Sequence, residues 1–163
     1  DFSQTKTLKR LDRTLESSGV FVISRSRGII WETRKPFAST MIVGASSITQ
    51  ISASGERSVL GAEGNAAFAQ FSDTMRAVLS GDAGKLYAGF DVYFQGRPES
   101  WRIGLVPRDS AVRAMVASMT IEGGADLLAF SIGEANGDTV RYRFANLVRS
   151  ESLLPADAAH FGR

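Results

Sequence analysis

The chain contains no cysteine, and only one of its 163 residues is a histidine. Without cysteine it can have no disulfide, no thiolate nucleophile and no cysteine-ligated zinc. His160 lies in residues 155–163, which we expect to form a solvated tail rather than a catalytic or metal-binding segment. Ser-His-Asp and Cys-His catalysis are therefore disfavoured, and we predict neither a metal site nor a cofactor.

Long apolar runs and an excess of one charge are also missing. No apolar run approaches the roughly 18 residues that a membrane-spanning helix needs. The 19 basic and 17 acidic residues leave a net charge of +2, which is too balanced to indicate a nucleic-acid partner. With 44% hydrophobic residues, the chain can bury a substantial core, so we expect one domain over residues 1–163.

Alternating apolar residues predict several strands that each have one apolar face. Phe21 and Ile23 share such a face in the first of these segments. Residues 90–94 and 101–105 repeat the period of two, and a further strand is expected at 118–121.

The clearest hairpin lies near the C-terminus. Residues 128–132 alternate between apolar and polar, and residues 140–144 alternate in the same way. Asn136-Gly137 lies between them, and this pair is typical of a tight hairpin turn. The sequence therefore predicts a strongly antiparallel sheet.

Residues 65–81 change to a helical period, with Asn65 as N-cap and Gly81 as the C-terminal stop. The apolar residues at steps of three and four are Phe68, Phe71, Met75, Val78 and Leu79. Residues 110–116 predict a helical turn, and residues 7–17 a short helix or an irregular link. The fold class is thus α+β, with a helix laid against an antiparallel sheet.

A curved sheet covered by a helix can be filled by side chains or can leave an apolar cavity. Large aromatic residues on its inner face are compatible with both outcomes, and for any single one of them an ordinary place in the core is the default. The residues alone lead no further than this.

Five residues near the N-terminus carry a resemblance to a known family. Phe2, Gln4 and Lys6 enter the first strand, Arg25 follows near a strand end, and Trp31 comes six residues later. This pattern resembles the opening of the LolA-type outer-membrane lipoprotein carriers.

The resemblance implies a half-open β-barrel covered by helices that binds acyl chains in an apolar cavity, without catalysis. It also implies a periplasmic monomer that takes lipoproteins or lipids from an inner-membrane donor to an outer-membrane acceptor. We expect the family's N-terminal helix to be absent from this chain. The expected cavity residues are Phe21, Ile23, Trp31, Phe68, Phe71, Met75, Leu79, Phe90, Phe94 and Trp101.

Arg25 shares the strand face of Phe21 and Ile23, where a guanidinium needs partners. The resemblance implies that it latches the covering helices by donating hydrogen bonds to their backbone carbonyls, a task that suits its planar fork. A surface ion pair with Glu16 or Glu32 is the alternative, and both interpretations stay open.

Two alternative functions also stay open. One is a lipid-binding accessory protein of an envelope lipid-biosynthesis pathway. The other is a small hydrolase or isomerase that uses carboxylates in the same cavity, which would need at least two acids or bases near one substrate atom.

Overall fold

The structure is a computed structural model that describes residues 1–24, 26–44, 47–61, 77 and 83–161. The elements are β1 (Phe2–Leu8), η1 (Lys9–Leu11), β2 (Arg13–Ser24), β3 (Gly28–Lys35), β4 (Ser39–Val43), β5 (Ser47–Ser52), β6 (Arg57–Gly61), α2 (Ala83–Gly89), β7 (Phe90–Arg97), β8 (Ser100–Pro107), α3 (Ser110–Arg113), β9 (Val116–Gly123), β10 (Leu127–Glu134), β11 (Thr139–Phe144) and α4 (Pro155–Phe161). The strands form one 11-stranded antiparallel sheet in the order β6-β5-β4-β3-β2-β1-β11-β10-β9-β8-β7. The predicted α+β class with a strongly curved antiparallel sheet is therefore confirmed.

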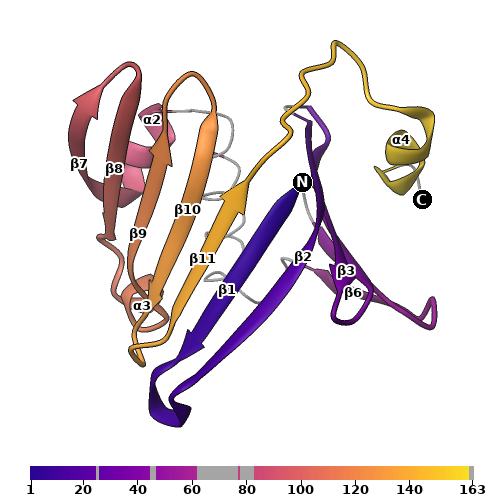
Figure 1. Cartoon of the computed structure of the whole chain (residues 1–163), viewed down its shortest axis with the longest axis horizontal. Coiled ribbons are helices and arrows are strands. Elements are labelled where there is room, and N and C mark those ends of the chain that lie inside the picture. The colour runs from indigo at the N-terminus through magenta and orange to yellow at the C-terminus, as the bar shows by residue number, and fades with distance from the viewer. Residues whose placement is uncertain (25, 45–46, 62–76, 78–82, 162–163) are drawn as a thin grey trace.

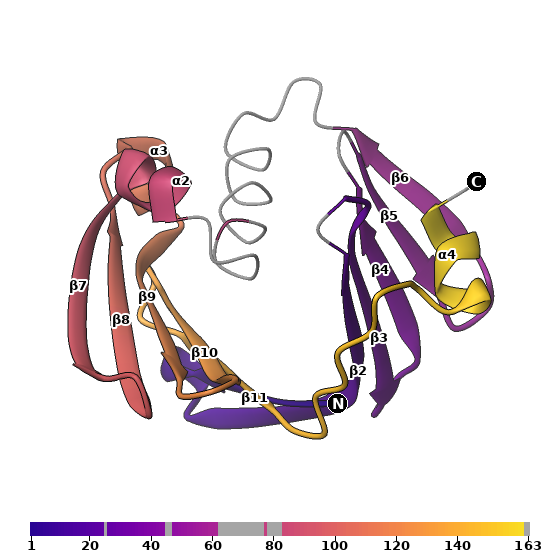
Figure 2. The same ribbon diagram turned by 90° about the horizontal axis from the view of Figure 1, so that it is seen from above.

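The sheet bends into an open U (Figure 2). Strands β7 to β10 form one wall, β11 and β1 form the base, and β2 to β6 form the other wall. Because β1 pairs with both β2 and β11, the first strand of the chain joins the two walls (Figure 1). We call the inner surface of the U the concave face and the outer surface the convex face.

The concave face carries the main core. Phe130 on β10, Leu105 on β8 and Met119 on β9 are almost completely buried. They pack in one cluster with Leu86 of α2 and with Ala77, which is helical and 2% exposed. The rest of the helix predicted at 65–81 lies outside the described residues.

The predicted C-terminal hairpin is confirmed, with β10 and β11 paired from Ala129↔Arg143 to Gly133↔Thr139. Its turn contains Gly137 at φ +89°, a left-handed conformation that glycine adopts without strain. The Oδ1 atom of Asn136 accepts a hydrogen bond from the backbone N–H of Asp138 (2.8 Å), which closes the turn locally.

The convex face of β8, β9 and β11 carries charged side chains, as the alternation of apolar and polar residues predicts. Glu122 accepts hydrogen bonds at 2.6 Å from Nη2 of Arg102 and from Nη2 of Arg141, so three strands are linked by one carboxylate. Burial alone would raise the pKa of Glu122, but the bonds and charges of the two arginines hold that pKa below its usual value.

The short helix or irregular link expected over residues 7–17 is wrong for most of these residues. The structure shows a short 3-10 turn at Lys9–Leu11, with strand on both sides of it. β1 and β2 pair residue by residue from Phe2↔Gly19 to Leu8↔Arg13, and this long-range ladder outweighs the weak local pattern.

Within the expected solvated tail, residues Pro155–Phe161 form α4, which contains His160 and has no buried residue. Proline at the first helical position and Asp157 in the first turn are typical of a helix start. Figure 2 shows α4 on the convex side of the β2–β6 wall, where Ile30 and Ile42 are 3% and 5% exposed. This wall is therefore buried on part of its outer face as well.

Among the described helices, none has the length and hydropathy to cross a bilayer.

Candidate functional site

Aromatic side chains from four strands meet at the base of the U. The ring centroids of Trp31 lie 5.0 Å from Phe2, 5.3 Å from Phe21 and 4.7 Å from Tyr142. Phe144 extends the cluster at 5.1 Å from Phe21. Tilted and edge-on contacts at these distances are favourable beyond simple area burial. The Phe and Trp of the N-terminal motif thus build one aromatic floor although they lie 29 positions apart in the chain.

The floor continues onto both walls of the U. On one side, Ile23 pairs with Ile29, which together with Val43 and Ile48 forms a second apolar row that packs on Phe21 and Trp31. This row extends the apolar surface from the aromatic floor onto the β2–β6 wall.

On the other side, the strand register places Phe130, Ile121, Ile103 and Phe94 in one line from β10 to β7. Cross-strand partners have side chains on the same face, so this line belongs to the concave face. Burial decreases along it, from 1% exposure at Phe130 to 64% at Phe94.

The expected cavity residues fall into three groups. Phe90 is 2% exposed and is part of the packed core. Trp101 lies against Gly123, where a Cβ atom would come within 2.3 Å of its ring, and its Nε1 donates to the backbone oxygen of Gly124 (3.0 Å). Trp101 is therefore held in place by its own strand partners.

Phe21 and Trp31 of the second group are half-buried in the aromatic floor, and Ile23 and Phe94 are exposed on the concave face. The third group lies outside the described residues and comprises Phe68, Phe71, Met75, Leu79 and the proposed latch Arg25. Of the two alternative partners of Arg25, Glu32 accepts a hydrogen bond from Nε of Arg34 (2.8 Å).

The concave face has more exposed apolar side chains than expected. Besides Ile23 and Phe94, the register places Leu15 and Met41 on it, and they are 52% and 37% exposed. A lone exposed apolar residue is ordinary, but four on one curved face over an aromatic floor make a surface that could bury an apolar ligand.

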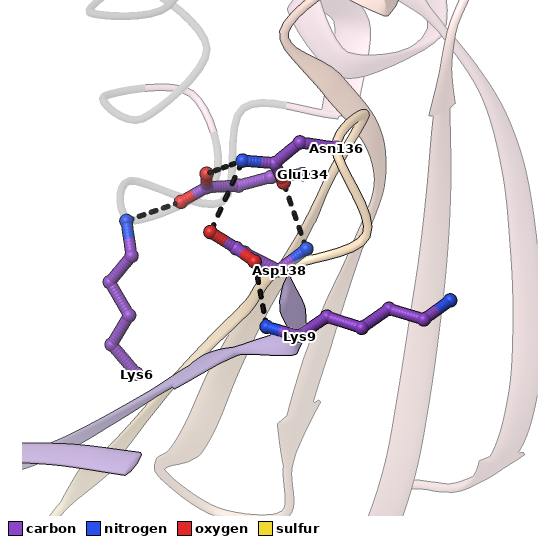
Figure 3. Close-up of polar contacts among 5 residues, drawn as sticks. All are labelled: Lys6, Lys9, Glu134, Asn136 and Asp138. Carbon is purple, nitrogen blue, oxygen red and sulfur yellow. Dashed lines mark hydrogen bonds and ion pairs between the residues drawn. The ribbon is translucent and has the colours of Figure 1, made fainter. Parts of the chain in front are cut away.

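Polar residues of the motif also lie on this face. Nζ of Lys6 donates to Oε1 of Glu134 at 2.8 Å, and the two side chains are 32% and 26% exposed (Figure 3). Gln4 lies opposite Tyr142, and its Oε1 accepts a hydrogen bond from Oγ of Ser17 (2.9 Å). The N-terminal motif thus contributes an apolar anchor, an amide and a cation to one surface.

Burial and, secondarily, the negative charge of Glu134 raise the pKa of Tyr142 to about 12. The phenol is therefore protonated at neutral pH and remains a hydrogen-bond donor.

Glu134 is itself held by the hairpin turn that follows it. Nδ2 of Asn136 donates to Oε2 of Glu134 (3.4 Å) and to Oδ2 of Asp138 (3.1 Å). Oδ1 of Asp138 accepts the backbone N–H of Lys9 (2.9 Å), which ties the β10–β11 turn to the β1–β2 turn (Figure 3). In the described part of the chain, no three His, Cys, Asp or Glu side chains gather as they would around a metal ion.

The amino-acid sequence alone assigns no role to this polar group, which comprises Gln4, Lys6, Tyr142 and Glu134. Gln4 and Lys6 belong to the N-terminal motif, and Tyr142 lies in the strand expected at residues 140–144. The signal that could have found them is their spacing, because residues at i, i+2 and i+4 of a strand share one face with Phe2. Glu134 gave no such signal, since carboxylates beside a hairpin turn are common.

The family model described as outer membrane lipoprotein carrier protein LolA matches residues 1–159 of the chain. No curated protein matches the chain. The family match covers almost the whole chain, including the motif residues of β1 and the first part of α4.

Proposed function

Because the chain belongs to the family of the outer membrane lipoprotein carrier protein LolA, whose members are periplasmic carriers and not enzymes, we propose that it carries the acyl chains of lipoproteins or lipids toward the outer membrane. The observation that supports this proposal is the concave face, where exposed apolar side chains lie above an aromatic floor in an open sheet.

The expected strength of binding shapes the mechanism. Burying an acyl chain is worth about 0.8 kcal/mol per methylene, or roughly 12 kcal/mol for sixteen carbons. A carrier with that affinity would not release its cargo, so its empty form must be stabilised by contacts that the loaded form loses. The proposed latch at Arg25 is the sequence-based candidate for this role.

Two alternatives predict different observations. A lipid-binding accessory of envelope lipid biosynthesis would use the same concave face with a different donor and acceptor. A hydrolase or isomerase would need free acids, whereas Lys6 and Asn136 engage Glu134, and Asn136 and the Lys9 N–H engage Asp138. Native mass spectrometry of gently purified protein separates a lipoprotein carrier from the lipid-pathway accessory, because the retained molecule is either a lipoprotein or a free lipid.

The test of the binding face uses two adjacent residues with equal exposure. Phe94 and Tyr93 on β7 are each 64% exposed, but Phe94 pairs with Ile103 on the concave face and Tyr93 pairs with Gly104 on the convex face. We expect Phe94→Ser to weaken binding of a fluorescent fatty acid by about 1 to 2 kcal/mol, or roughly 5- to 30-fold in Kd. Tyr93→Ser should leave the Kd unchanged.

Fluorescence titration and circular dichroism of both variants check affinity and folding together. If wild-type protein binds no fatty acid, or if the two variants lose affinity equally, the concave face is not the carrier surface.

A further inference from the structure

A carrier of acyl chains needs an apolar surface, yet an ion pair between Lys6 and Glu134 lies on the concave face at the base of the U. By the strand register, Lys6 and Glu134 are the charged side chains on the concave face of β1 and β7–β11 in the described residues. A partly buried ion pair contributes little net stability compared with apolar side chains of similar size. Its position beside the aromatic floor therefore suggests a role in binding.

Three side chains of this group have hydrogen-bond donors that the described contacts do not use. An ammonium has three N–H donors, and the described contacts of Lys6 use one of them, toward Glu134. The contacts of Tyr142 within the described part of the chain are ring contacts with Phe2, Trp31 and Phe130, and none of them uses its hydroxyl. The Ser17 bond engages the oxygen of the Gln4 amide, and its NH₂ group has no bond within the described part of the chain.

The strand register places the three residues next to one another on the concave face. Gln4 and Tyr142 are directly opposite each other on β1 and β11, and such partners have Cβ atoms about 5 Å apart. Lys6 is two positions further along β1 on the same face, opposite Val140. An ammonium, an amide and a phenol in this arrangement match the acceptor oxygens of one carboxylate or phosphate group.

We propose that Gln4, Lys6 and Tyr142 form a head-group site, and that, of the two cargo classes, this carrier takes a free lipid whose acyl chain ends in an anionic oxygen group. This proposal rests on the proposed function, since it names the class of molecule that the concave face takes. The acyl chain lies along the aromatic floor and the apolar walls, and its carboxylate or phosphate binds at Lys6.

Glu134 has a defined part in this site. In the empty protein the Glu134 carboxylate is paired with the ammonium of Lys6, and an incoming anion replaces Glu134 as the partner of Lys6. Glu134 keeps its contact with Asn136, so it remains held at the turn after Lys6 is released. The internal carboxylate therefore competes with the cargo and limits the affinity for anionic head groups.

The experiment compares three probes with the same acyl chain, namely a fatty acid, its methyl ester and a lysophosphatidic acid. Wild-type protein should bind the two anionic probes more tightly than the ester. Lys6→Met should raise the Kd of the two anionic probes by roughly 10-fold or more and leave the Kd of the ester nearly unchanged. Glu134→Gln should lower the Kd of the anionic probes only.

Two further variants control for folding and for net charge. Lys6→Met leaves Glu134 without its ion-pair partner, so the double variant Lys6→Met/Glu134→Gln removes both charges together and should show the same loss of preference for anions. Arg143→Met removes one positive charge from an exposed convex-face residue next to Tyr142 and should not change any of the three affinities.

The outcomes separate the two proposals. If all three probes bind and Lys6→Met affects acid and ester alike, the head-group site is wrong and the carrier function stands. If no probe binds to wild-type protein, the carrier function fails and the head-group site fails with it. A stronger effect on the phosphate probe than on the carboxylate identifies a phospholipid head group as the source of the anion, and the reverse identifies a fatty acid.

Discussion

The line of apolar residues from β10 to β7 predicts how stability and ligand binding divide along the concave face. Phe130 at one end is 1% exposed and belongs to the core cluster, whereas Phe94 at the other end is 64% exposed. A buried phenylalanine truncated to alanine loses both its transfer free energy and the packing around the cavity that it leaves. We therefore expect Phe130→Ala to lower the free energy of unfolding by about 3 to 5 kcal/mol.

The same truncation at Phe94 should cost far less. Complete burial of a phenylalanine is worth about 1.5 to 3 kcal/mol, and only the smaller part of this side chain is covered, so Phe94→Ala should cost about 1 kcal/mol or less. The ratio of the two effects follows from burial alone, because both residues lie on the same face of the same sheet.

Urea denaturation followed by tryptophan fluorescence gives both values, with circular dichroism as a second probe of two-state unfolding. Phe130→Leu is the matched control, since it keeps most of the apolar volume and should cost clearly less than Phe130→Ala. The reasoning is refuted if Phe94→Ala destabilises the protein as much as Phe130→Ala does, or if Phe130→Ala costs under about 1 kcal/mol.

Two further predictions concern titration and release. Because burial raises the pKa of Tyr142 to about 12, alkaline absorbance titration should show a phase near that pH that Tyr142→Phe removes. The folded protein holds the phenolic proton above the unfolded pKa of about 10, so Tyr142 contributes fully to the free energy of unfolding below pH 10 and loses that contribution between pH 10 and 12. An absorbance titration in which Tyr142→Phe removes no phase near pH 12 would contradict the assignment. If Arg25 latches the empty state, Arg25→Leu should raise lipid affinity and slow transfer to acceptor vesicles, whereas an exposed ion pair predicts a stability change of about 0 to 1 kcal/mol with binding and transfer unchanged.

Local patterns were enough to predict most of the strands. Alternation is a property of neighbouring residues, so β7, β8, β10 and β11 could be predicted, and Asn136-Gly137 could be read as their clearest turn. The family resemblance rested on five residues and is confirmed over residues 1–159.

Segments without a strong local pattern were hard to predict because distant contacts decide their structure. The stretch between β1 and β2 has no clear period, and its strands form through pairing with each other and with β11. The C-terminal residues look polar and short, but α4 has the wall of β2–β6 beside it, where Arg27 donates to the backbone oxygen of Ala158 (3.5 Å). A helix of seven residues is marginal by itself and depends on such packing.

By itself, the sequence determined the fold class, the family and the face of β1 that holds Phe2, Gln4 and Lys6, because these depend on spacing along a single strand. Only the tertiary structure decided which side chains this face meets. Lys6 and Glu134 are 128 positions apart, and they come together because β1 lies between β2 and β11 in the sheet. Pairing between the two ends of a chain is set by the global arrangement of strands, which no local period encodes.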